Sequence, residues 1–234
     1  MIKIVGLENI VDLIPFSSGI LFVIKDGQLK GTSKVSFYSF DVKTKSIASV
    51  TKNAYLLTKF GASFHAVSSQ LGDYISCDSV KLWNGNTFVI YSNGDTGLFS
   101  QDGRLLKTDQ VTYELPSIRN REDMKYPARD CAAYNNEIWC VVPDMNCIVQ
   151  YSLVKNRIKL RIGGDKSNTF DEPLAVCVYG DSLYVSNTGA NNIKRVSLED
   201  YSVEIYKQFD EPVYKYLRIE DKEFAVLDSG VYLL

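Results

Sequence analysis

A chain of 234 residues is long enough for one large or two small domains, and a closed all-β domain commonly fills this length alone. Hydrophobic residues make up 45% of the sequence, which is ample for a buried core and argues against disorder. The net charge of −2 lacks the basic excess that nucleic-acid binding and attraction to anionic membranes normally require. We therefore expect one folded domain with neither a nucleic-acid nor a membrane partner.

The first predicted element is the short apolar run from Ile2 to Val5, whose residues favour a β-strand. Lys3, Glu8 and Asp12 interrupt the apolar N-terminal stretch, and no small-residue cleavage pattern follows it. These features predict neither a signal peptide nor a membrane span. The 5 cysteines lack paired spacing, which favours free thiols in a reducing compartment. We expect a cytoplasmic protein.

Similar units then follow along the chain, each with an apolar run that ends at a turn signal. The aligned runs are 20–24, 88–91, 138–142, 182–186 and 224–227. In four units an apolar residue followed by Ser ends the next run, at Tyr38-Ser39, Phe99-Ser100, Tyr151-Ser152 and Val196-Ser197. Polar and apolar residues alternate in the last strands, at 46–51, 104–108, 157–162 and 202–208. One unit is thus an antiparallel meander of about 40 residues, the size of a propeller blade.

The unit from Phe170 to Gln208 shows this pattern most clearly. Its segments PLAVCV (173–178), LYVSNTG (183–189) and NNIKRV (191–196) resemble the NHL repeat of β-propellers. The unit departs from the repeat at Asn187, where the family usually carries Asp. The resemblance implies blades of four antiparallel strands.

We therefore predict an all-β fold, a five-bladed β-propeller of four-stranded antiparallel blades in one domain, 1–234. The expected blades are approximately 8–51, 75–113, 128–164, 173–209 and 211–234 with 1–6. The chain ends where the last blade still needs its fourth strand. Residues 2–5 are therefore predicted to close the last blade, which removes an exposed sheet edge.

Two long segments between blades, Lys52 to Tyr74 and Glu114 to Pro127, are predicted to share one face of the propeller. They carry aromatic and basic residues suited to protein recognition. The expected partner-binding residues are Phe60, Phe64, His65, Arg119, Arg121, Tyr126 and Arg129. We expect a non-catalytic, monomeric module that binds a protein partner through this face and needs no cofactor or metal.

An alternative is a carbohydrate-binding or glycoside-hydrolysing propeller with acids at the central channel. The acids in question, Asp12, Asp78 and Asp130, lie at similar distances before their aligned strands. Glycosidases use paired carboxylates, but the same acids can instead bond loop amides near the strand ends. The single histidine, His65, does not fit the lyases of NHL type, which rely on several histidines.

Overall fold

The computed structural model describes the chain in segments. These are residues 1–6, 10–16, 19–29, 32–57, 80–83, 86–90, 96–99, 105–108, 112–114, 118–119, 125–126, 130–134, 137–152, 155, 157–164 and 166–234. The regular structure in them consists of antiparallel strands and two short 3₁₀ helices, so the fold is all-β. No helix in these segments is long and apolar enough to span a membrane.

Most strands belong to five antiparallel sheets that follow chain order. The first sheet contains β2 (Ile10–Phe16), β3 (Gly19–Leu29), β4 (Thr32–Asp41) and β5 (Ser46–Leu57). The second contains β6 (Val80–Trp83), β7 (Asn86–Ile90), β8 (Thr96–Phe99), β9 (Leu105–Thr108) and β10 (Thr112–Glu114). The third contains β13 (Asp130–Tyr134), β14 (Glu137–Val142), β15 (Cys147–Ser152) and β16 (Arg157–Gly163).

The last two sheets are the best aligned with the sequence pattern. The fourth contains β17 (Pro173–Tyr179), β18 (Ser182–Asn187), β19 (Asn192–Ser197) and β20 (Val203–Gln208). The fifth contains β21 (Val213–Ile219), β22 (Lys222–Leu227), β23 (Gly230–Leu233) and β1 (Ile2–Val5). The 3₁₀ helices, η2 (Pro143–Met145) and η3 (Thr188–Ala190), join the second and third strands of the third and fourth sheets.

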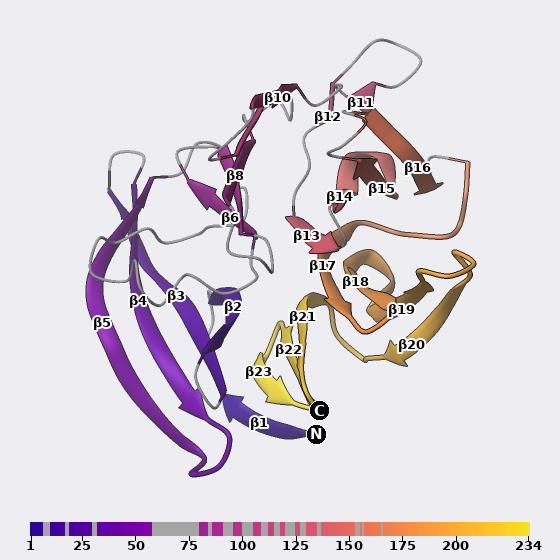
Figure 1. Cartoon of the computed structure of the whole chain (residues 1–234). Helices are drawn as coiled ribbons and strands as arrows, with labels where there is room; N and C mark the ends of the chain where they lie inside the picture. The colour runs from indigo at the N-terminus through magenta and orange to yellow at the C-terminus, as the bar shows by residue number, and fades with distance from the viewer. Residues whose placement is uncertain are drawn as a thin grey trace.

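The five sheets succeed one another around the molecule, and the two chain ends lie side by side (Figure 1). The first strands of successive sheets contact one another: β6 with β13, β13 with β17, β17 with β21, and β21 with β2. One buried apolar cluster joins the first, fourth and fifth sheets and includes Phe22, Tyr184 and Phe224. A second joins the third and fourth sheets around Trp139 and Leu183. Burial of these faces is the main stabilising contribution.

The first hairpin has the same length in every sheet. The last residue of the first strand pairs with the residue three positions later: Phe16 with Gly19, Trp83 with Asn86, Tyr134 with Glu137, Tyr179 with Ser182, and Ile219 with Lys222. Two-residue loops of this kind favour positive φ, which Gly180 (56°) and Glu220 (52°) adopt. We call the end of the strands where these loops lie the hairpin face, and the opposite end the connection face.

The structure corrects several predicted boundaries in the first half of the chain. The predicted run 20–24 was expected to end at a turn signal, Lys25-Asp26-Gly27, but this segment is a register shift inside β3, whose pairing with β4 continues to Leu29. Glycine within a strand often marks such a bulge, and here Gly27 directly follows Asp26, the residue that the pairing skips. The predicted connection from Lys52 begins as strand, because β5 continues to Leu57.

The second sheet also differs from the prediction of four strands. It has a fifth, because β10 pairs with β9, and Glu114 lies in that strand rather than in a connection. Further along the same predicted connection, β11 (Ile118–Arg119) pairs with β12 (Lys125–Tyr126). A two- or three-residue strand is too short to show the alternation on which the prediction rested.

The strand expected to complete the last sheet is present. β1 pairs with β23 through Ile2 with Leu233, Lys3 with Tyr232, and Val5 with Val231. Gly230 allows this approach, because a Cβ there would lie 2.1 Å from the Val5 carbonyl oxygen. Its φ of 141° also disfavours any other residue.

We predict that Gly230→Ala destabilises the protein more than Gly164→Ala. Gly164 has a similar φ of 133°, and a Cβ there would meet no atom within 4 Å, so this variant isolates the backbone strain of about 1 to 3 kcal/mol. Gly230→Ala adds the clash with β1. Chemical denaturation of both variants tests the difference. In a chain lacking residues 1–6 the two substitutions should cost the same, and a persistent difference there would contradict the proposed origin of the effect.

Candidate functional site

Four first strands place one residue at an equivalent position near the connection face. Four residues before the last residue of the first strand lie Asp12, Asp130, Ala175 and Lys215, which pair with Val23, Val141, Ser186 and Val226. In β2, β17 and β21 a register shift comes directly before this residue. Bulges of this kind re-aim side chains and are frequent near functional sites. We call this set the axial position.

Asp130 connects three first strands at the axial position. Its side chain is 2% exposed, and Oδ2 accepts hydrogen bonds from the Val176 amide (3.1 Å) and from Lys215 Nζ (2.9 Å). The amide belongs to β17 and the lysine to β21, so one carboxylate links β13 to both following sheets. A buried carboxylate is stable only when it is paired and hydrogen-bonded in this way.

The other two predicted channel acids differ in how much of each residue the structure describes. Asp12 occupies the axial position in β2, next to the strand that carries Lys215, while its side chain is outside the described residues. Asp78 lies outside them altogether. Lys215 was not predicted, although its place four residues before Ile219, the last residue ahead of the Glu220-Asp221 loop, is a signal once the hairpins are aligned.

The predicted partner-binding residues fall mostly outside the described segments. Phe60, Phe64, His65, Arg121 and Arg129 lie there. Arg119 and Tyr126 are placed by their backbones on the paired strands β11 and β12, where Tyr126 stands opposite Ile118 and Arg119 opposite Lys125. In this register Arg119 and Tyr126 are not paired with each other, and positions one residue apart alternate between the two faces of a strand.

Side chains fix the described turns of the connection face. The side-chain oxygen of Asn146 accepts a hydrogen bond from the Glu172 amide (2.8 Å), and the Thr188 hydroxyl donates to the Val213 carbonyl (2.8 Å). Glu211 accepts hydrogen bonds from the Ser229 amide and hydroxyl. The first two bonds run from the turn of one sheet to the start of the next, so this face is held rigidly.

Carboxylates predominate on the described part of this face. Its acids are Asp144, Asp171, Glu172, Asp210, Glu211 and Asp228, and Lys166 is the base in the same turns and links. Among them stands Tyr214, the residue at the register shift in β21, which is 39% exposed. The Tyr214 hydroxyl donates to Asp228 Oδ1 (2.6 Å). This hydrogen bond is the main cause, with partial burial and nearby carboxylates, that raises the pKa of Tyr214 to about 12.

The arrangement suits recognition of a cationic group by an aromatic ring and carboxylates. Within the described segments no group of three or more His, Cys, Asp or Glu side chains is arranged to hold a metal ion.

Comparison with known proteins shows a likeness of fold. No family model matches the chain, and no curated protein matches it. Among solved structures, an auxiliary nutrient-binding protein from Bacteroides thetaiotaomicron aligns with a TM-score of 0.60 and 9% identity, over 97% of this chain and 70% of that one. A computationally designed protein, Ika4, aligns over 69% of this chain and 92% of its own with a TM-score of 0.41 and 8% identity, too low to support an argument.

The first of these likenesses and the succession of antiparallel sheets fit a β-propeller-like fold. At 9% identity the likeness concerns the fold alone. The NHL resemblance of residues 170–208 stays a prediction.

We predict that Asp130→Asn lowers the free energy of unfolding by about 3 to 5 kcal/mol, because it removes the negative charge of the Asp130–Lys215 ion pair. Glu204→Gln, in the exposed pair with Arg195, is the matched control and should cost less than about 1 kcal/mol. A double-mutant cycle with Lys215→Met measures the coupling. Additive effects of the two substitutions would show that the pair does not stabilise the fold.

We also predict a pH dependence from Tyr214. Its phenol loses a proton near pH 10 in the unfolded chain and near 12 in the folded one, so its contribution is complete below pH 10 and is lost as the pH rises to about 12. The wild type should therefore lose stability more steeply than Tyr214→Phe between pH 10 and 12. Denaturant unfolding at each pH gives the comparison, and parallel curves for the two proteins would refute the assignment.

Proposed function

We propose that the protein is a non-catalytic, monomeric five-bladed β-propeller that binds a protein partner through its connection face. The five sheets are the blades, with β1 completing the fifth. The equal first hairpins and the 97% coverage by a propeller-like neighbour support this architecture. That neighbour is described as a nutrient-binding protein, which is in keeping with a binding role for the fold.

The observation that carries the proposal is Tyr214, an exposed aromatic ring among carboxylates on a rigid face. Aromatic residues held in place are frequent energetic centres of protein interfaces. The surrounding carboxylates favour a partner segment rich in Lys or Arg and speed its encounter. The predicted connections Lys52 to Tyr74 and Glu114 to Pro127 are proposed to share this face, with Phe60, Phe64, His65, Arg119, Arg121, Tyr126 and Arg129 as further partner-binding residues.

The contacts of Asp130 favour binding over glycoside hydrolysis. A general acid or nucleophile must reach the substrate, whereas the Asp130 carboxylate is buried and accepts hydrogen bonds from Val176 and Lys215. This counts against the carbohydrate-active alternative in which Asp12, Asp78 and Asp130 form the site.

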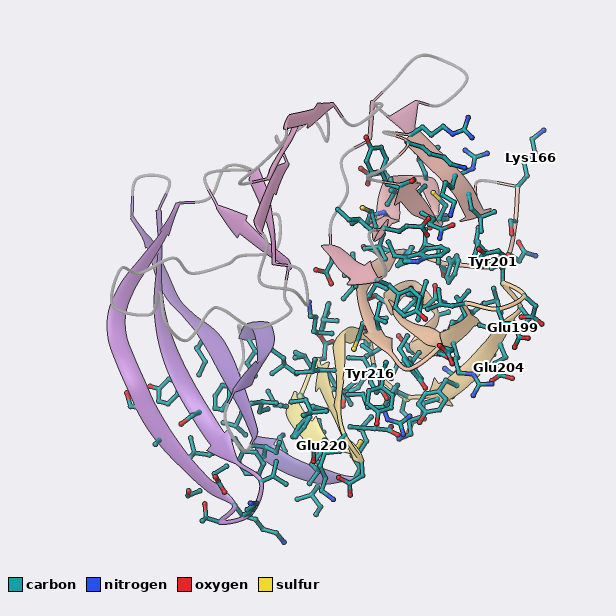
Figure 2. The ribbon with its side chains drawn as sticks, in the orientation of Figure 1. Lys166, Glu199, Tyr201, Glu204, Tyr216 and Glu220 are labelled. Atoms are coloured by element: carbon teal, nitrogen blue, oxygen red, sulfur yellow. The ribbon has the colours of Figure 1, made fainter. Side chains whose placement is uncertain are left out.

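Charge reversal on each face tests the proposal. Glu172→Lys with Asp210→Lys changes the connection face, and Glu199→Lys with Glu220→Lys makes the same change in charge at loops of the hairpin face. Figure 2 shows Glu199 at the outer edge of the fourth sheet, and all four side chains are exposed. We expect quantitative affinity capture to lose a specific partner with the first pair only.

Two further results complete the test. Tyr214→Ala should weaken binding of the captured partner by about tenfold or more, and raised salt should weaken it as well. Equal capture by both charge-reversal variants would contradict a role for the connection face.

A further inference from the structure

The fifth sheet departs from the pattern of the other four at the hairpin face. The last residue of the first strand is aromatic in four sheets, Phe16, Trp83, Tyr134 and Tyr179, and is Ile219 in the fifth. The preceding residue is apolar in four sheets, Pro15, Leu82, Ala133 and Val178, and is Arg218 in the fifth. Since the same hairpin forms four times without a charge at this position, folding does not require Arg218.

Three contacts hold the Arg218 guanidinium in place. Its central carbon lies 4.3 Å from the centroid of the Tyr179 ring, so the cation stacks on the fourth sheet. One terminal nitrogen donates to the Tyr184 hydroxyl (3.3 Å), and Nε donates to the Glu220 carbonyl (3.4 Å). A guanidinium fixed in this way loses little conformational entropy when it binds a ligand.

The nearby carboxylates are engaged elsewhere. Glu223 stands opposite Arg218 in the sheet, close enough for attraction between the two charges, and its oxygens accept hydrogen bonds from the Tyr206 hydroxyl (2.5 Å) and from Lys207 (2.5 Å). Asp221 pairs with Lys222 (2.6 Å). In the part of the chain that the structure describes, Arg218 therefore has no carboxylate within ion-pair distance.

The surroundings of Arg218 are aromatic and partly polar. The rings of Tyr184, Tyr206 and Tyr216 pack together between the fourth and fifth sheets, with centroids 5.0 to 6.2 Å apart. Tyr216 lies inside this layer (Figure 2), and its buried hydroxyl has no hydrogen-bond partner among the described residues. A buried hydroxyl without a hydrogen-bond partner lowers the stability of the fold, so apolar packing alone does not account for a tyrosine at this position.

We propose that Arg218 is the anion-binding residue of a second ligand site, on the hairpin face, for a small molecule that bears an oxyanion. The guanidinium has five N–H donors in one plane, and its described contacts use two. The remaining donors form a fork that fits the two oxygens of a carboxylate or of a phosphate group. Tyr179 supports the fork from one side, and Tyr134 lies at the equivalent position one sheet away.

Calorimetric titration of the full chain tests the site with defined probes. The carboxylate probes are benzoate and glucuronate, the phosphate probe is inorganic phosphate, and sodium chloride at equal ionic strength is the blank. We expect saturable binding of at least one probe, with a dissociation constant on the order of 1 mM. Binding of carboxylates alone or of phosphate alone supports the site and identifies the source of the oxyanion.

Substitutions then assign the binding to Arg218. Arg218→Gln should weaken it by about tenfold, and Arg218→Lys, which keeps the charge but loses the fork, by a smaller factor. Arg195→Gln is the matched control, because Arg195 pairs with Glu204 on the exposed part of the fourth sheet and should leave the affinity unchanged. Melting curves establish that each variant is folded; if Arg218→Gln is not, Arg218→Lys decides the question.

Failure of this proposal is distinguishable from failure of the proposed function. The variant Glu172→Lys with Asp210→Lys changes the other face and should retain the affinity for the probe. No saturable binding by the wild type, or equal affinity in a folded Arg218 variant, would overturn the assignment.

Discussion

The carboxylate of Asp130 is the contact on which the arrangement of the third, fourth and fifth sheets depends. Each first strand has a free edge toward the axis, and an unpaired amide there is costly when buried. Asp130 accepts a hydrogen bond from one such amide, at Val176, and neutralises Lys215 on the strand beyond. One buried acid thus fixes the spacing of three first strands. The same contacts also fix where the connection-face links between these sheets begin and end.

The repetition in this protein is a repetition of geometry. Equal two-residue hairpins, and register shifts at the same distance from them in β2, β17 and β21, place equivalent residues at one level, although those residues differ in chemistry. The axial position carries Asp, Asp, Ala and Lys. Because the backbone constraint lies in turn length and bulge position, the side chains at equivalent places are open to specialise. That explains how similar sheets form from units with little identity.

Sequence patterns predicted the later sheets better than the earlier ones, for physical reasons. Between 137 and 234 the strands are four to seven residues long and end at turn residues. The runs predicted at 138–142, 157–162, 182–186, 202–208 and 224–227 therefore lie within two residues of the bounds of β14, β16, β18, β20 and β22. In the first sheet, a glycine inside a long strand resembled a turn. In the second sheet, β10 was too short to show the alternation of polar and apolar residues. The closing strand was predictable because the last sheet needed a fourth member. The Asp130–Lys215 pair was not, since it joins residues 85 positions apart in strands of different sheets.

The two faces offer different means of building a binding site. On the connection face the links between sheets vary in length, so both backbone and side chains contribute, and Tyr214 stands among carboxylates that a cationic partner can approach. On the hairpin face the first loop of each sheet has the same length of two residues, so at these loops and the strand ends beside them side-chain identity distinguishes one sheet from another. When the same hairpin forms in the other four sheets without a charged residue at one position, a charge at that position in the fifth sheet is not needed for folding. Arg218 carries this charge, and its contacts with Tyr179 and Tyr184 fix the orientation of the guanidinium. We therefore infer that the guanidinium binds a ligand in this orientation.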